Sequence, residues 1–134
     1  EFLSGIKYLI DNNIISIKSD TTIPSVVIIT EKTKYRVGEE ISITVKNVGT
    51  ESITFGGYPP FGIRNSQNKV ICCSGYDLLL TLFPNKQSNY IWDQMNFSSS
   101  NQVEKGKYEI FTTFASKNYL DNTYKVTKWI EISD

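Results

Sequence analysis

Histidine is absent from all 134 residues of the sequence. This absence removes the side chain that most often acts as a general base near neutral pH and is the commonest metal ligand. Carboxylates are present but scattered. Glu39, Glu40 and Asp93 could pair as acid and base only if folding brought them together, and solvated surface charge is the simpler interpretation. The sequence therefore predicts a protein that is not an enzyme.

Motifs for phosphate and metal binding are lacking as well. The pair Gly56-Gly57 has neither the spacing nor the following Lys-Ser/Thr of a phosphate-binding loop. Aspartate, asparagine and glutamate nowhere take the spacing of a calcium-binding loop. We expect no cofactor and no metal site.

Cysteine occurs only twice, at the adjacent positions Cys72 and Cys73. Neighbouring residues on a strand point to opposite faces, so the two side chains cannot easily bridge each other. The pair provides neither a disulfide framework nor a zinc site. We expect one core thiol and one surface thiol, and the alternative is an intermolecular disulfide through the exposed one.

An excess of one charge and long apolar runs are also missing. Lysine plus arginine total 14, as do aspartate plus glutamate, so no basic field attracts nucleic acid. No apolar run approaches the roughly 20 residues that a membrane span needs. The sequence predicts no nucleic-acid partner and no direct membrane insertion by this segment.

What the sequence does contain, after Asp20, is a repeated period-two pattern. In residues 41–46, for example, Ile41, Ile43 and Val45 alternate with polar side chains, which indicates a strand with one dry and one wet face. Turn residues recur every 8–12 positions between such runs. The predicted strands cover residues 25–30, 41–46, 52–55, 61–65, 70–73, 77–83, 88–92, 107–115 and 123–132. This pattern predicts an all-β fold, an immunoglobulin-like antiparallel β-sandwich of about seven to nine strands.

The first 20 residues differ from the rest. Phe2, Ile6, Leu9 and Ile10 fall on one helical face, which favours a short N-terminal helix, and the alternative is a linker. We therefore divide the chain into an N-terminal segment, residues 1–20, and a sandwich domain, residues 21–134.

Residues 53–63 carry no charge, and paired glycines and prolines prevent them from forming one continuous strand. Surfaces depleted in charge and rich in aromatic side chains are typical of the centre of an interface. We predict that part of this segment is a contact surface for a homodimer or an envelope partner. In the alternative, the segment simply caps the core. The candidate interface residues are Ile53, Phe55, Tyr58, Phe61 and Ile63.

Other aromatic side chains fit the core better than a ligand site. Tyr35, Trp92, Tyr108 and Trp129 are expected to pack in or beside it. Residues 93–102 form a polar loop that contains the glycosylation triplet Asn96-Phe97-Ser98.

Two stretches resemble known families. Residues 35–49 (YRVGEEISITVKNVG) are similar to immunoglobulin-like domains of prokaryotic surface proteins. Residues 88–94 (SNYIWDQ) with 103–110 (VEKGKYEI) resemble the BsuPI-like domain, which is named after a proteinase inhibitor of bacilli and is frequent in archaeal extracytoplasmic proteins. The proline typical before Gly106 is replaced by Glu104-Lys105. The resemblance implies that Trp92 and Tyr108 belong to the core.

The resemblance also implies a role. It suggests a non-enzymatic protein-binding module at the cell surface, anchored by a segment upstream of Glu1, similar in style to archaellum accessory proteins of the FlaF type that tie a filament motor to the S-layer. One alternative is a proteinase inhibitor that presents residues 93–102. Another is a subunit that polymerises by donating a strand from residues 14–17.

Overall fold

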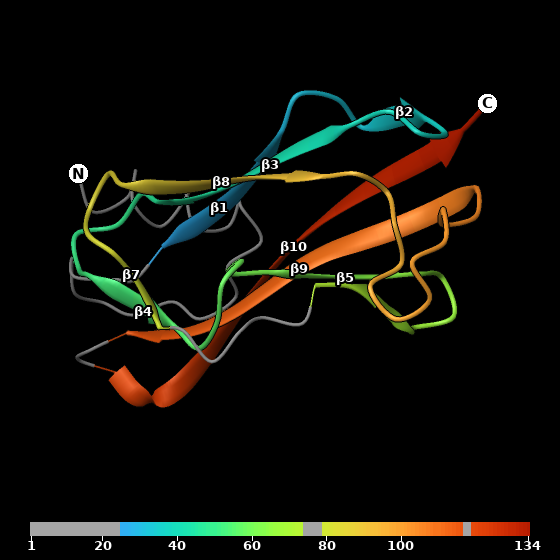
Figure 1. The fold of residues 1–134 in the computed structure, drawn as a ribbon. Helices are drawn as coiled ribbons and strands as arrows, with labels where there is room; N and C mark the ends of the chain where they lie inside the picture. Colours follow the sequence, from blue (N-terminus) through green and yellow to red (C-terminus); the bar gives the residue numbers. More distant parts are fainter. Residues whose placement is uncertain (1–24, 74–78, 117–118) are drawn as a thin grey trace.

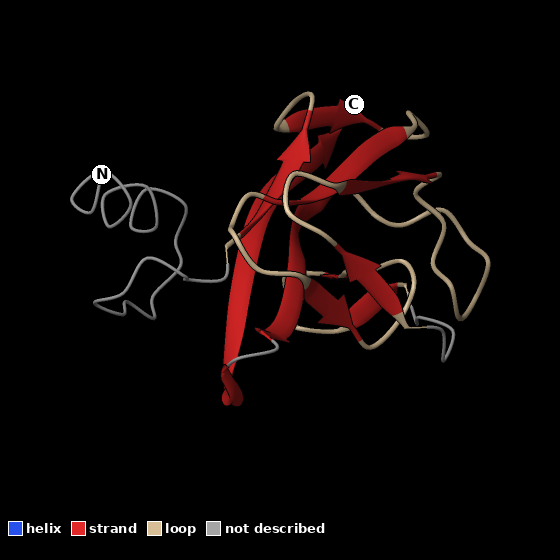
Figure 2. Ribbon diagram, turned by 90° about the vertical axis from the view of Figure 1, so that its left-hand side faces the viewer, coloured by secondary structure: helices blue, strands red, loops and turns tan. Residues whose placement is uncertain are grey.

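The computed structural model describes residues 25–73, 79–116 and 119–134, and every regular element in this part is a β-strand (Figures 1 and 2). In these residues there is no helix that is long and apolar enough to cross a membrane. The strands are β1 (Val26–Thr30), β2 (Lys34–Arg36), β3 (Ile41–Asn47), β4 (Ile53–Phe55), β5 (Gly62–Arg64), β6 (Val70–Cys72), β7 (Leu80–Leu82), β8 (Gln87–Trp92), β9 (Gly106–Ser116) and β10 (Tyr119–Ser133).

The strands form two sheets. The smaller has the order β1-β3-β8, and the larger has the order β2-β10-β9-β4-β7, with β5 paired to β9 and β6 paired to β5. All described pairings are antiparallel except that of β2 with β10. The predicted immunoglobulin-like sandwich is confirmed, with more strands than expected.

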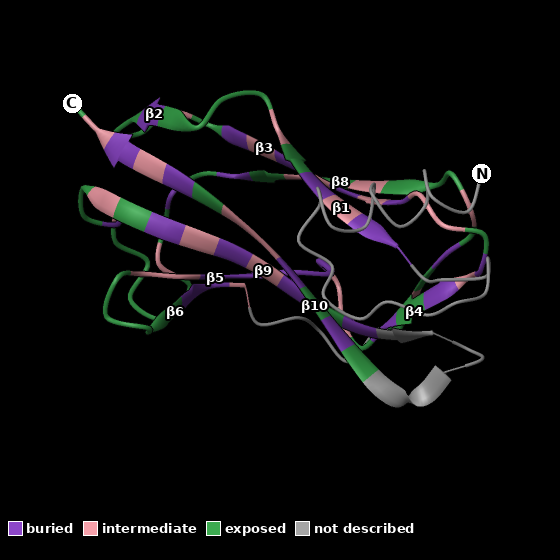
Figure 3. Cartoon of the chain, turned by 180° about the vertical axis from the view of Figure 1, so that it is seen from behind, coloured by how far each residue is buried: buried purple, intermediate pink, exposed green. Residues whose placement is uncertain are grey.

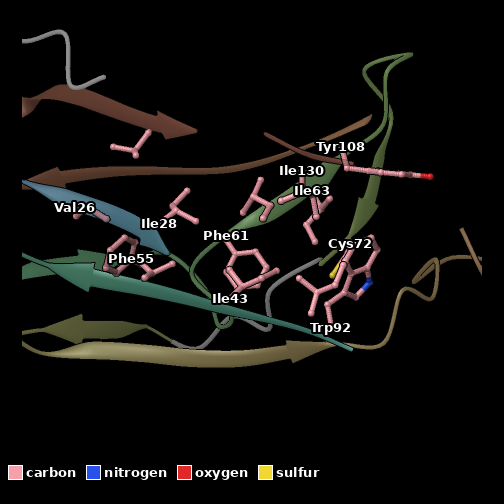
Figure 4. Packing of buried hydrophobic residues seen from close by; sticks show 14 of the residues in the cluster. Val26, Ile28, Ile43, Phe55, Phe61, Ile63, Cys72, Trp92, Tyr108 and Ile130 are labelled. Atoms are coloured by element: carbon pink, nitrogen blue, oxygen red, sulfur yellow. The ribbon is translucent and has the colours of Figure 1, made fainter. Parts of the chain in front are cut away.

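The core lies between the sheets because their strands alternate. In β3, Ile41, Ile43 and Val45 are completely buried, while the residues between them are partly exposed. The predicted inward row of β9, from Tyr108 to Phe114, is also buried (Figures 3 and 4). Each large apolar side chain removed from water in this way stabilises the fold by about 1.5–3 kcal/mol.

Two aromatic residues give the core features typical of immunoglobulin-like domains. Trp92, at the end of β8, packs edge-on against Tyr108 with ring centroids 6.1 Å apart. Its indole Nε1 donates a hydrogen bond to the Met95 carbonyl oxygen at 3.1 Å. The Tyr108 hydroxyl donates to the carbonyl oxygen of Glu104, four residues upstream, which is the arrangement called a tyrosine corner. Both side chains are core residues, as predicted.

A buried asparagine links the ends of three strands. Asn47 is fully buried at the end of β3, and its Nδ2 donates to the carbonyl oxygens of Glu51 at 2.7 Å and Leu82 at 2.9 Å. Its Oδ1 accepts a hydrogen bond from the Gly49 backbone N–H at 2.9 Å. Both N–H groups and the oxygen of the side-chain amide are thus hydrogen-bonded, which suits a polar group in the core.

The cysteine prediction was wrong. Cys72 and Cys73 are joined to each other by a disulfide, and neither is free. The prediction assumed regular strand geometry at both residues. However, β6 ends at Cys72, so Cys73 lies beyond the strand and the alternation of faces does not apply to the pair.

Other differences concern single segments. Sequence reasoning missed β2, and it predicted a strand over 77–83 where β7 covers Leu80–Leu82. The predicted helix and the proposed division at residue 20 lie outside the described residues.

Candidate functional site

Four of the five predicted interface residues lie inside the domain. Ile53, Phe55, Phe61 and Ile63 are at most 6% exposed and belong to the core cluster (Figure 4). Their side chains are enclosed between the sheets and are not exposed on the surface of the folded domain, as in the alternative that the segment caps the core. The physical reason is that both ends of the segment pair with β9, which turns their apolar side chains between the sheets.

Tyr58 is the exception, because it is only partly buried. Its ring packs edge-on against Tyr90 of β8 with centroids 6.4 Å apart, and Phe61 contacts the same ring at 5.7 Å. Tyr58 therefore closes the space between the sheets beside β8.

Residues 53–63 form two short strands, β4 and β5, which pair one after the other with the same side of β9 and are separated by a loop. β4 pairs with residues 115–116 of β9, and β5 pairs with residues 109–111. The seven residues 55–61 thus lie opposite the three residues 112–114, and the extra length must leave the plane of the sheet. The Thr112 hydroxyl donates to the Pro60 carbonyl oxygen and ties the loop to β9 across the interruption.

A pocket of about 290 Å³ opens at this interruption. Its walls come from the loop, from β9 and from the end of β6, and no charged side chain is among the described residues that line it. They are Phe55, Gly56, Gly57, Pro59, Pro60, Phe61, Gly62, Val70, Cys73, Phe111, Thr112 and Thr113. The pocket can take an apolar group.

In the wall of the pocket, the aromatic ring of Phe111 lies close against β5. A Cβ at Gly62 would lie 2.6 Å from Cζ of Phe111, so only glycine leaves room for the ring there. The Arg64 guanidinium lies over the same ring, with its Cζ 4.0 Å from the centroid. Arg64 also forms a salt bridge with Glu109, 2.8 Å between Nε and Oε1. The two charges neutralise each other within the surface.

Trp129 completes this surface. It lies directly opposite Glu109 in the β9–β10 register, and Glu109 lies opposite Arg64 on β5. Trp129 is 52% exposed, so the prediction that it packs with the core was wrong. Tyr124, Val126 and Ile130 point inward from the same strand, and alternation turns Trp129 outward. We call Arg64, Glu109, Phe111 and Trp129, together with the adjoining pocket, the contact patch.

The predicted polar loop, residues 93–102, is held by one buried side chain that sequence reasoning did not single out. Gln94 is fully buried, and its Nε2 donates to the carbonyl oxygens of Arg36 and Glu39, both at 2.8 Å. Its Oε1 accepts from the Gly38 N–H at 3.0 Å and from Gln102 Nε2 at 2.8 Å. The only signal in the sequence was its place in the Trp-Asp-Gln motif of the BsuPI-like resemblance. The loop is therefore attached firmly to the turn between β2 and β3.

The scattered carboxylates have separate local partners. Glu39 forms an ion pair with Lys32, and the hydrogen bond from Lys32 lowers the pKa of Glu39, with help from the Arg36 backbone N–H. Asp93 accepts a hydrogen bond from the Met95 N–H at 3.0 Å. In the described part of the chain no three side chains of metal-ligating type gather in one place.

No family model and no curated protein matches the chain. Among solved structures, a CARDB domain of a Pyrococcus furiosus protein, in complex with di-metal ions, is similar with a TM-score of 0.44 and 16% identity, over 83% of this chain and 94% of that one. The β-glucosidase of Listeria innocua is similar with a TM-score of 0.43 for its D270A mutant and 13% identity, over 83% of this chain and 16% of its own length. A β-glucosidase of Erythrobacter marinus has a TM-score of 0.39 and 14% identity, over 82% and 16%. The chain thus spans only a small part of the β-glucosidases it matches.

Proposed function

We propose that the chain is a non-enzymatic protein-binding module of the cell envelope, which anchors or builds a surface filament of the archaellum type by contacting an S-layer protein or another envelope protein. The resemblance of residues 35–49 to domains of prokaryotic surface proteins supports this location. So does the resemblance of residues 88–94 and 103–110 to a domain that is frequent in archaeal extracytoplasmic proteins. The contact patch supports the binding role.

The observation that carries the proposal is the half-exposed indole of Trp129, which lies opposite Glu109 on β9, two residues from Phe111 in the wall of an open, uncharged pocket. Tryptophan and arginine are the residue types that most often dominate binding energy at interfaces. Since Arg64 and Glu109 already neutralise each other, a partner does not need to supply a countercharge. The matching surface is neutral, with an apolar side chain that fills the pocket and a flat group that covers the indole.

Capture of envelope proteins on the immobilised domain tests this proposal. Trp129→Ala removes the exposed ring, and Val70→Asp places a charge at the pocket, where Val70 is 40% exposed. Each should reduce retention of the partner about tenfold or more, the effect of losing at least ~1.4 kcal/mol of binding. Phe83→Ala is the matched control, because Phe83 is 60% exposed and outside the contact patch.

Retention unchanged by both patch variants, or lost equally with Phe83→Ala, would exclude the contact patch as the binding surface. Circular dichroism of each variant shows that the fold is retained.

A second copy of the chain is the other partner that we propose for the same surface. Light scattering at micromolar to millimolar concentration should then show a dimer, and Trp129→Ala should shift it toward monomer. A wild-type chain that stays monomeric throughout removes the homodimer from the proposal.

The inhibitor alternative gains one observation in its favour. The hydrogen bonds of Gln94 hold the 93–102 loop in place, and the loop exposes Met95 and Phe97. A preorganised loop is what tight inhibition of a protease needs. An assay against serine proteases at micromolar concentration tests it, with Phe97→Ala as the variant that should abolish inhibition. The strand donor at residues 14–17 lies outside the described residues and stays a prediction.

A further inference from the structure

Asn96 begins the only Asn-x-Ser/Thr triplet among the 134 residues. The triplet lies in the 93–102 loop between β8 and β9, where Asn96 is partly exposed and Phe97 and Ser98 are exposed. Neither the contact patch nor the core uses these side chains.

The two polar atoms of the Asn96 side chain have different roles. Its Oδ1 accepts hydrogen bonds from the backbone N–H groups of Ser98 at 2.8 Å and Ser99 at 3.3 Å. Its Nδ2 has no hydrogen-bond partner among the described residues. The atom to which a sugar would be attached is therefore the one that the fold does not use.

The loop also keeps its shape without that nitrogen. The Asn96 N–H donates to the Asn101 carbonyl oxygen, and the Ser100 N–H donates to the Asn96 carbonyl oxygen, both at 2.8 Å. The Phe97 N–H donates to the Ile71 carbonyl oxygen at 3.0 Å and fixes the loop to β6. A substituent on Nδ2 breaks none of these bonds.

A polar cleft of about 380 Å³ adjoins Asn96. The residues that line it include Asn65 and Lys69 of the β5–β6 hairpin and Asn101 of the loop itself. Amide and ammonium groups of this kind are hydrogen-bond partners for sugar hydroxyls. The cleft gives an attached saccharide both room and polar contacts.

We infer that Asn96 is an acceptor for an N-linked saccharide, an inference that rests on the extracytoplasmic location proposed above. In the transfer, Nδ2 bonds to the anomeric carbon of a lipid-linked saccharide. The bond from that carbon to the phosphate oxygen breaks, the lipid phosphate leaves with the electron pair, and the amide gives up one proton. The donor is thus a polyprenyl phosphate or diphosphate sugar, used by an oligosaccharyltransferase.

Peptide mass mapping of the chain isolated from the cells that encode it tests the inference. Cleavage after Lys86 and Lys105 gives the single peptide 87–105, which contains Asn96. We expect this peptide to be heavier than its sequence by whole sugar residues. Ser98→Ala should abolish the increase and Ser98→Thr should retain it, while Asn101→Gln, a neighbouring asparagine outside the triplet, should leave it unchanged.

An unmodified 87–105 peptide overturns the inference, and the cell fraction in which the chain is found shows whether the proposed location fails with it. Secretion of the chain through the yeast endoplasmic reticulum, behind a leader, tests the acceptor alone. No sugar on Asn96 in that experiment also overturns the inference. The capture experiment with bacterially produced, sugar-free protein tests the contact patch independently.

Discussion

Gly38 and Gln94 are joined by a hydrogen bond of 3.0 Å from the glycine N–H to the glutamine Oε1, although 56 positions separate them in the sequence. Gln94 also holds a backbone φ of 64°, a conformation that side-chain-bearing residues rarely adopt. The hydrogen bonds of its amide offset this strain and connect the 93–102 loop to the turn between β2 and β3.

Gln94→Leu should therefore be strongly destabilising. The substitution keeps the side-chain size but leaves the Gly38 N–H and the carbonyl oxygens of Arg36 and Glu39 without this partner. We expect the free energy of unfolding to fall by about 3–5 kcal/mol, measured by urea denaturation. Gln87→Leu on the exposed face of β8 is the control, with an effect within about 0.5 kcal/mol. A loss below ~1 kcal/mol for Gln94→Leu would contradict this role.

Because of Tyr108, we expect the free energy of unfolding to decrease at alkaline pH. Burial raises the pKa of Tyr108 above its ordinary value, and the Glu104 charge adds to this effect. The folded state then holds the phenol proton at pH values where the unfolded state has lost it, so stability is unaffected at neutral pH and falls as pH rises above about 10.

Tyr108→Phe separates the two contributions of the hydroxyl. At neutral pH it should cost about 1–2 kcal/mol, because the hydrogen bond to the Glu104 carbonyl oxygen is lost. Above pH 10 the variant should lose stability less steeply than the wild type, as followed by urea denaturation at successive pH values. Parallel curves would mean that Tyr108 does not titrate between these states.

The two tryptophans should differ sharply in their effect on folding. Trp92→Ala should lower the free energy of unfolding by about 3–5 kcal/mol, because the ring is 2% exposed and packs on Tyr108. Trp129→Ala should cost less than about 1 kcal/mol, since the ring is half exposed. Similar losses for both would place Trp129 in the core after all.

Charge substitutions in the 53–63 segment should unfold the domain. Ile53→Asp and Ile63→Asp each place a carboxylate at a completely buried position without a counterion. Circular dichroism should show loss of the β signal at neutral pH. Thr54→Asp is the control, because Thr54 is exposed on the same strand, and it should remain folded. If Ile53→Asp folded normally and only the oligomeric state changed, Ile53 would belong to an interface instead.

Much of the fold could be predicted because long strands with one solvent-exposed face show a clear alternation of apolar and polar residues in the sequence. The alternation in residues 41–46 and 107–115 located β3 and β9 to within a residue or two. β2 was missed because three residues are too few for a period, and because it pairs with β10 nearly a hundred positions away. Such pairing depends on tertiary structure that no local pattern contains.

The candidate site was harder to predict, since an uncharged aromatic segment fits a core and a surface equally well. In the structure, the side chains of Ile53 and Ile63 point into the core, while the prolines between them line the pocket. Trp129 could have been placed correctly, because the alternation through Val126 and Ile130 leaves it on the outer face. The salt bridge between Arg64 and Glu109 could not, because it requires the β5–β9 register.

The interruption between β4 and β5 separates the framework of the two sheets from the loop that lines the pocket. Because both short strands are fixed to β9, the register of the sheet does not depend on how many residues connect them. Substitutions at the exposed Gly56 can therefore reshape the pocket, while Tyr58 and Pro60 keep their contacts with Tyr90 and Thr112. A library of variants with differently shaped pockets can be built at this position on an unchanged domain.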